Sequence, residues 1–211
     1  MYRLSQLAFE LMTRLLFRVE IHGRENIPAK EPYLIASNHM SYLDPPLIGM
    51  AFRHIVVNFI AKKELFGRSL VGLWSRSVQT IKMDRERGIE GLKEAFKRIK
   101  EGKVIAIFPE GTRVSEGGDS SVKKGIGFIV VRAKVPVVPV LIKGTGKALP
   151  KGGGMKRGAR VSLHIGRPIP VSDPGIREAT ERKDYEAVSS YLMSRIHDVG
   201  AQKDPHDTHP S

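Results

Sequence analysis

The chain has 211 residues, 41% hydrophobic and 27% charged, so it is long enough to fold around a core and is not a disordered chain. It contains no cysteine, which excludes disulfides, thiolate catalysis and cysteine-ligated metals. The formal net charge of +13 indicates either a polyanionic partner or a basic surface that serves solubility alone. The basic residues are spread out and form no aromatic-rich block, so we expect no nucleic-acid partner.

The first predicted element is a helix within residues 1–18, where apolar residues recur at positions 4, 7, 8, 11, 12, 15 and 16. Three charged residues interrupt this stretch, so it is shorter than the roughly 20 apolar residues of a spanning helix. No small-residue cleavage pattern of a signal peptide follows it. Either the helix packs on the core, or it lies in a bilayer interface with Phe9, Leu16 and Phe17 toward the lipid.

Strand-like and helix-like segments alternate through residues 19–202, which we expect to form one domain. Strands are predicted at residues 19–22, 33–37, 55–60, 78–82, 104–108, 137–142 and 161–165. Helices are predicted at residues 45–52, 65–75, 88–101, 126–134 and 184–197. This alternation, with continuously apolar strands, predicts an α/β fold in which helices flank a mostly parallel central sheet of about seven strands.

Two segments of the chain are predicted to lack regular structure. Residues 147–158 are rich in glycine and lysine and indicate a flexible basic loop. Residues 203–211 are expected to form a disordered tail, and its two histidines are better explained by solvation than by metal binding.

A possible base and a carboxylate follow the predicted strand at residues 33–37. His39 could take a proton from a hydroxyl group, and Asp44 could fix the tautomer of the imidazole and stabilise its charged form. The run Asp44-Pro45-Pro46 is also a good helix start, so Asp44 has an alternative role as a helix cap. A carboxylate has two oxygens, and the two roles are compatible.

A second group of polar residues follows the strand at residues 104–108. Ligands of parallel sheets bind beyond the carboxyl ends of the strands, where this segment and His39 would meet. Gly111 allows close backbone approach, Thr112 offers a hydroxyl, and Arg113 offers a planar fork suited to phosphate. Glu110 could accept from a substrate hydroxyl or hold Arg113, and the alternative is a capped loop with a local ion pair.

Two further segments have less specific patterns. Arg85 follows the strand near residue 82, again at a strand end. Residues 135–140 carry two prolines, which disfavour a regular central ladder. They indicate a sheet edge, a shaped wall of a site, or simply an irregular strand.

In their order, these segments resemble the conserved blocks of the glycerolipid acyltransferases. Asn38-His39 through Asp44 is similar to their H-x4-D motif, and residues 83–85, 108–113 and 135–140 are similar to the following three blocks. Residues 61–65 resemble the segment between the first two blocks, while Lys82-Met83 departs from the apolar residues often found in the second. Within the family the likeness is to the bacterial 1-acyl-sn-glycerol-3-phosphate acyltransferases.

The resemblance implies transfer of an acyl chain from acyl-ACP or acyl-CoA to the 2-hydroxyl of lysophosphatidate, giving phosphatidate. It implies His39 and Asp44 as catalytic residues. Arg113, Arg85 and Lys62 would hold the acceptor phosphate, and Glu110 would position glycerol oxygens or Arg113. It favours the interfacial interpretation of residues 1–18, and so a peripheral or monotopic protein on the anionic cytoplasmic face of the cell membrane.

The expected mechanism is direct transfer in a ternary complex. The chain has no cysteine, and Ser41 lacks a nucleophile-elbow context, so no residue is a convincing covalent nucleophile. Backbone amides beside His39 or Gly111 are candidate oxyanion donors. Because thioesters are already activated, we expect no metal or cofactor.

Two other functions are compatible with the sequence. Enzymes with the same motifs acylate other lysolipids, including lysophospholipids and lyso-ornithine lipids. A non-catalytic module that binds anionic membranes through its net charge is the other alternative, although charge alone does not require His39, Asp44 and Glu110 at strand ends.

Overall fold

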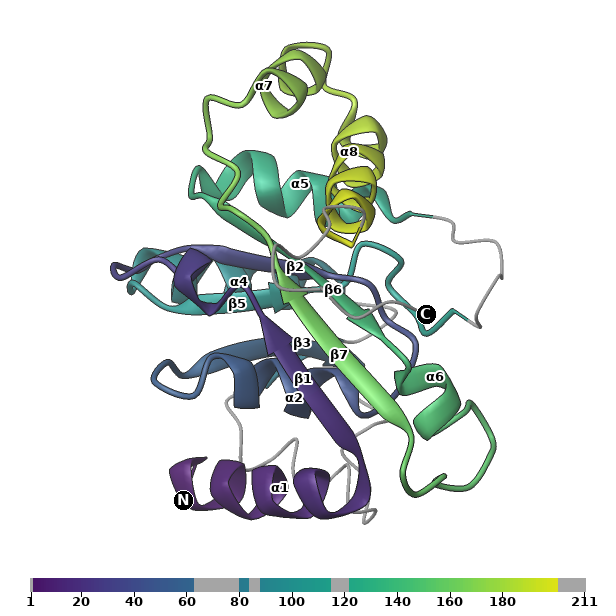
Figure 1. Ribbon diagram of the computed structural model, residues 1–211. Coiled ribbons are helices and arrows are strands. Elements are labelled where there is room, and N and C mark those ends of the chain that lie inside the picture. Colours follow the sequence, from purple (N-terminus) through teal and green to yellow (C-terminus); the bar gives the residue numbers. More distant parts are fainter. Residues whose placement is uncertain (1, 63–79, 84–87, 115–121, 201–211) are drawn as a thin grey trace.

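The protein is built on one seven-stranded sheet flanked by helices (Figure 1). The computed structural model describes residues 2–62, 80–83, 88–114 and 122–200. The strands are β1 (Arg18–His22), β2 (Leu34–Ser37), β3 (Val57–Lys62), β4 (Ile81–Met83), β5 (Val104–Ile107), β6 (Val137–Lys143) and β7 (Arg160–Ile165). Their order is β1-β7-β6-β2-β5-β3-β4, and every neighbouring pair is parallel except β6 and β7. The predicted α/β fold with a mostly parallel sheet is confirmed.

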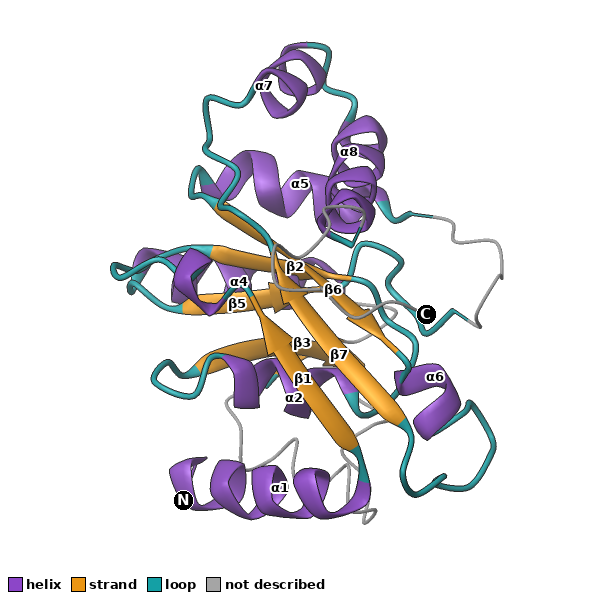
Figure 2. Ribbon diagram, viewed as in Figure 1, coloured by secondary structure: helices purple, strands orange, loops and turns teal. Residues whose placement is uncertain are grey.

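Helices cover both faces of this sheet (Figure 2). They are α1 (Tyr2–Leu16), α2 (Asp44–Ala51), α4 (Gly88–Lys100), α5 (Lys124–Ala133), α6 (Thr145–Ala148), α7 (Pro174–Glu181) and α8 (Tyr185–Val199), with a short 3-10 turn η1 (Arg24–Asn26). The central strands have apolar residues on both faces: Tyr33 and Ile35 pack toward α2, whereas Leu34 and Ala36 pack toward α5 and α8. This double burial explains the continuous apolar strands of the sequence.

Helices α6 and α7 were not predicted from the sequence, whereas the predicted bounds of α2, α4, α5 and α8 agree with the structure to within two residues. The helix predicted at residues 65–75 and the tail at residues 203–211 lie outside the described residues. Helix α6 includes the first residues of the segment predicted as a flexible loop. Helix α7 has the Asp-Pro start that was recognised at residue 44, with Asp173 accepting from the N–H of Gly175 (3.0 Å).

Strand β6 is an interior strand, so the prediction of a sheet edge at its prolines is wrong. Pro139 lies opposite Ala36 of β2. On the other side of β6, the pairing with β7 breaks between Val140 and Val137, and only the carbonyl of Pro139 is used there, accepting from Gly166 (2.8 Å). Pro139 has no N–H group, and it lies where the ladder between β6 and β7 is interrupted, so no donor is required at that position.

Helix α1 packs on the domain with one face and exposes the other. Phe17, which directly follows it, is only 4% exposed, and Phe9 and Leu16 pack against the same core. The amide of Gln6 donates to the carbonyl of Gly49 in α2 (2.9 Å). The expectation that Phe9, Leu16 and Phe17 face lipid is therefore wrong. The side chains exposed along the outer face are those of Leu7 (64%), Leu11 (61%) and Leu15 (77%).

Within the described residues, no helix combines the length and the apolar character needed to cross a bilayer.

Candidate active site

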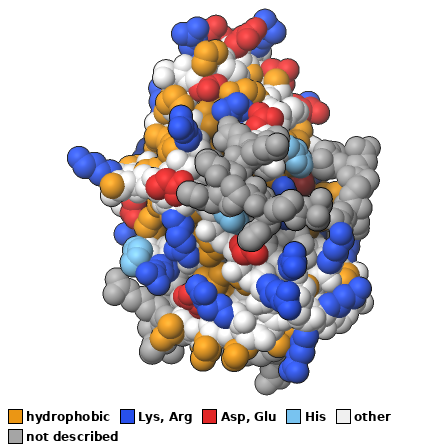
Figure 3. Space-filling view, in the orientation of Figure 1, with side chains coloured by type: hydrophobic (Ala, Val, Ile, Leu, Met, Phe, Trp, Pro, Cys, Tyr) orange, Lys and Arg blue, Asp and Glu red, His pale blue; other side chains and the backbone are white. Residues whose placement is uncertain are grey.

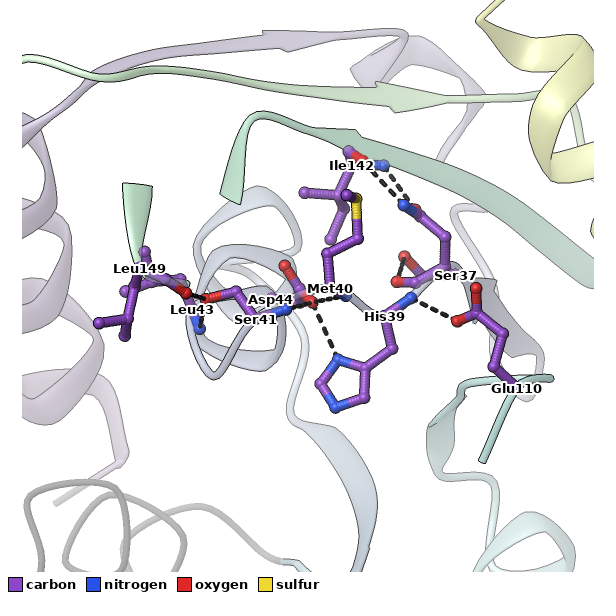
Figure 4. A network of polar contacts seen from close by, with 10 residues as sticks. Ser37, His39, Met40, Ser41, Leu43, Asp44, Glu110, Ile142 and Leu149 are labelled. Atoms are coloured by element: carbon purple, nitrogen blue, oxygen red, sulfur yellow. Dashed lines mark hydrogen bonds and ion pairs between the residues drawn. The ribbon is translucent and has the colours of Figure 1, made fainter. Parts of the chain in front are cut away.

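The turn between β2 and α2 is anchored by Asn38 at the carboxyl edge of the parallel strands. Its side-chain amide donates to the carbonyl of Ile142 (2.8 Å), and its oxygen accepts from the N–H of the same residue (2.8 Å). The buried Asn38 side chain thus extends the pairing of β2 with β6 beyond its last backbone pair, Ser37 with Val140. Figure 4 shows the two hydrogen bonds to Ile142 as dashed lines. Because Asn38 directly precedes His39, these two hydrogen bonds also fix the backbone position of His39.

His39 and Asp44 form the centre of the turn, as the sequence predicted. Nδ1 of His39 lies 2.9 Å from Oδ2 of Asp44, and Asp44 is fully buried. The carboxylate requires a proton on Nδ1, so Nε2 is left as the basic nitrogen. No described residue forms a hydrogen bond or ion pair with Nε2, and the side chain of His39 retains 15% exposure. The ring stacks on Phe108, with centroids 4.2 Å apart, which fixes its plane.

Asp44 orients the turn but does not cap helix α2. The cap residue is Leu43, with no side-chain bond, and Asp44 is the first residue of the helix itself. Its Oδ2 points back and accepts from the N–H groups of Met40 (2.7 Å) and Ser41 (2.7 Å) as well as from His39. The predicted capping role is therefore wrong. Three donors on one buried oxygen make the carboxylate the organising group of the turn.

The segment after β5 holds the backbone of His39 from two directions. Oε2 of Glu110 accepts the N–H of His39 (2.7 Å), and the N–H of Val114 donates to the carbonyl of His39 (2.9 Å). Glu110 is only 4% exposed. Burial raises the pKa of Glu110 to about 7; the charge of Asp44 adds to the rise, and the hydrogen bond from His39 opposes it. Glu110 thus supports the candidate base directly, a role that the sequence did not predict.

Arg113 is positioned by an aromatic ring. Its guanidinium carbon lies 3.6 Å from the ring centroid of Tyr42, a residue of the His39 turn that sequence reasoning missed. Stacking fixes the guanidinium plane and leaves its N–H edge for an anion. Among the described residues, Arg113 forms no ion pair with Glu110, so the expected local pair is not observed.

Gly111 gives the segment its turn. Its φ of +64° lies in the left-handed region, and a Cβ at this position would approach Cγ of Lys123 to 2.7 Å. Thr112 beside it is exposed.

The remaining candidates are less complete. Lys62 ends β3 at the same edge of the sheet, and Arg85 lies outside the described residues. The amides named as oxyanion donors are engaged: those of His39, Met40 and Ser41 donate to carboxylates, and that of Gly111 donates to Phe108 (2.9 Å). Among the described residues, no cluster of three or more His, Asp or Glu side chains could hold a metal ion.

A family model described as Acyltransferase matches residues 18–143, which include His39, Asp44, Glu110 and Arg113. The chain belongs to the acyltransferase family. This acyltransferase is 32% identical over 202 residues to the 1-acyl-sn-glycerol-3-phosphate acyltransferase of Bacillus subtilis, covering 94% of this chain and 96% of that protein. It is 33% identical to the chloroplastic LPAT1 of Arabidopsis thaliana, a 1-acyl-sn-glycerol-3-phosphate acyltransferase, over 72% of this chain and 44% of that one.

A solved structure supports the same assignment. The crystal structure of the 1-acyl-sn-glycerophosphate acyltransferase PlsC from Thermotoga maritima is similar to this acyltransferase with a TM-score of 0.74 and 30% identity. The match covers 96% of this chain and 81% of that one. The similarity thus extends over the whole sheet and its flanking helices.

Proposed function

We propose that this acyltransferase moves a fatty acyl chain from acyl-ACP or acyl-CoA to the 2-hydroxyl of 1-acyl-sn-glycerol 3-phosphate, forming phosphatidate. The observation that carries the proposal is the arrangement of His39, Asp44 and Arg113. Nδ1 of His39 is hydrogen-bonded to the buried carboxylate of Asp44, which leaves Nε2 as the basic nitrogen. The turn that carries His39 lies at the same edge of the sheet as the stacked guanidinium of Arg113. The names of the relatives support the choice of acceptor.

The reaction proceeds by direct transfer. Nε2 of His39 accepts the proton of the acceptor hydroxyl as its oxygen attacks the thioester carbonyl, and Asp44 stabilises the imidazolium. The tetrahedral intermediate collapses, the carbon–sulfur bond breaks, and the thiolate takes the proton from His39. The thioester is itself activated, so the proposal includes no cofactor. Arg113 holds the acceptor phosphate, with Lys62 and Arg85 as further candidates.

We also propose that α1 docks the enzyme on the cytoplasmic face of the cell membrane. Leu7, Leu11 and Leu15 would enter the apolar layer while the opposite face of the helix stays on the domain. Residues 1–18 would then be a docking element built into the catalytic domain of residues 19–202. This arrangement makes point variants of the exposed leucines a better test than deletion of residues 1–18, which would also remove the buried Phe17.

The decisive experiment is mass-spectrometric product analysis with lysophosphatidate and each donor. His39→Ala should lose on the order of 10²–10⁴-fold in turnover with little change in melting temperature. His54→Ala is the matched control, because His54 is an exposed histidine just after α2. Near-normal turnover of His39→Ala would contradict the assignment of the base.

A panel of acceptors tests the phosphate site. Arg113→Ala should raise the KM for lysophosphatidate and leave that for a non-phosphorylated analogue unchanged. Arg113→Lys keeps the charge but loses the planar stacking on Tyr42, so it should recover only part of the affinity. An equal rise in KM for both acceptors would contradict the role of Arg113. A preference of the wild type for another lysolipid would show that lysophosphatidate is not the acceptor.

A further inference from the structure

A basic hollow lies beside the active edge of the sheet, mostly beyond the residues that the family model matches. It has a volume of about 690 Å³. Its cationic side chains, all exposed, are those of Lys143, Lys147, Lys156, Arg157 and Arg160, and its single carboxylate is that of Glu20. In Figure 3, Lys and Arg side chains gather at the lower right, over α6 and the chain that follows it. This surface suits an anionic ligand.

The basic hollow is joined to the end of helix α1. The N–H of Gly158 donates to the carbonyl of Leu16 (2.7 Å), and the N–H of Arg18 donates to the carbonyl of Ala159 (3.0 Å). Arg18, an exposed residue at the start of β1, lies in register with Arg160 of β7. The cations therefore begin where the helix ends.

The outer face of α1 adds an apolar surface next to these cations. Leu7, Leu11 and Leu15 are spaced by one helical turn and form a row that we name the leucine ridge. Figure 3 shows hydrophobic side chains along the lower rim of the molecule, over α1, beside the basic side chains. Apolar and cationic surfaces thus adjoin on one side of the protein.

Helix α6, whose Lys147 lines the basic hollow, also contacts the turn that carries His39. Helix α6 packs on Met40, whose Cε lies 3.2 Å from where a Cβ on Gly146 would be. The hydroxyl of Ser41 donates to the carbonyl of Leu149, directly after α6 (2.9 Å). A surface held at the basic hollow would consequently lie close to the candidate base.

We propose that the basic hollow binds the phosphate groups of anionic lipid headgroups while the leucine ridge enters the apolar layer of the same bilayer. This inference rests on the proposed membrane docking of α1. A bilayer with anionic lipids offers phosphates and an apolar layer side by side, whereas an acidic protein would match only the cations and leave the leucine ridge exposed. Contact at both places holds the His39 edge near the surface where the lipid acceptor resides.

The test is vesicle sedimentation with the full chain. Vesicles of phosphatidylcholine alone are compared with vesicles that also contain phosphatidylglycerol. Lys156→Glu/Arg157→Glu should weaken binding to the anionic vesicles by at least about tenfold, leave binding to the neutral vesicles unchanged, and remove most of the salt dependence. The control is Lys30→Glu/Lys103→Glu, an equal charge change at exposed positions before β2 and β5, on the opposite edge of the sheet. Circular dichroism verifies that each variant is folded.

Three outcomes would overturn the proposal. They are unchanged binding of the variant to anionic vesicles with unchanged kinetics, unchanged binding with a raised KM for the thioester donor, or an equal loss of binding in the control. The second of these would assign the basic hollow to the donor. Acyl transfer by the wild type to lysophosphatidate dispersed in detergent is measured in parallel. Absence of that transfer refutes the proposed function, whereas transfer with a failed vesicle test refutes the lipid site alone.

Discussion

The β2–α2 turn and helix α1 depart from the usual distribution of polar and apolar groups in opposite ways. The turn is held by two buried carboxyl groups: Oδ2 of Asp44 accepts from three donors of the turn, and Oε2 of Glu110, from the segment after β5, accepts from the N–H of His39. Helix α1 leaves the apolar side chains of Leu7 and Leu11 largely exposed. The difference separates two requirements: a reacting group needs fixed geometry, whereas a docking surface needs apolar area that folding has not used.

The largest effect that would test this comparison is expected at Asp44. In the wild type, the single oxygen Oδ2 of Asp44 accepts from His39, Met40 and Ser41. In Asp44→Asn, an amide oxygen at that place would keep the three hydrogen bonds but lose the negative charge that stabilises the imidazolium of His39. An amide nitrogen there would instead face the N–H groups of Met40 and Ser41. Turnover should fall on the order of 10³–10⁴-fold. Steady-state kinetics with saturating donor and acceptor measure the loss. Asp198→Asn, an exposed aspartate on α8, is the control, and equal activities of the two variants would show that the turn is not the catalytic centre.

A smaller effect is expected from the second buried carboxylate. The pKa of Glu110 is about 7 in the folded protein and near 4.5 when unfolded, so the folded state keeps a proton that the unfolded state loses. The free energy of unfolding should therefore fall by about 3 kcal/mol as the pH rises from 4.5 to 7, then level off.

Glu110→Gln should remove this part of the pH dependence. Urea unfolding at a series of pH values measures it, with the exposed Glu101→Gln as the control. If the two variants show the same pH profile, burial of Glu110 is not coupled to its ionisation.

The smallest effect on stability is expected at the leucine ridge. Leu7→Ser/Leu11→Ser should change the free energy of unfolding by no more than about 0.5 kcal/mol per site, because both side chains are already in water. Phe17→Ala, on the buried side of the same region, should cost about 3–5 kcal/mol. Vesicle binding should nevertheless weaken in the leucine variant. Destabilisation comparable to that of Phe17→Ala would show that the leucine ridge is part of the core.

Much of the fold could be read from local pattern. Residues 104–108 are continuously apolar because β5 is buried on both faces, and that pattern indicates a strand without knowledge of its neighbours. Helix α6 was missed because its four residues contain too little periodicity to detect. The prolines of β6 suggested an edge because the break in β7 that accommodates Pro139 lies far away in the sequence.

The candidate site shows the same division. His39 and Asp44 are five residues apart, so their pairing within one turn could be predicted. The contacts of Glu110 with His39 and of Arg113 with Tyr42 join segments about 70 residues apart, and no local pattern encodes them. Tyr42 was accordingly not recognised as part of the site.

By itself, the sequence determined the class of fold, the pairing of His39 with Asp44, and the presence of an amphipathic N-terminal helix. These features depend on residue types at short spacing, which local geometry translates directly. The tertiary structure decided which apolar face of α1 the domain covers and the direction in which Asp44 points. It also placed the basic hollow close to the end of α1 and to the turn that carries His39. Those outcomes depend on which distant surfaces meet when the sheet assembles, because burial and hydrogen bonding are properties of the packed chain.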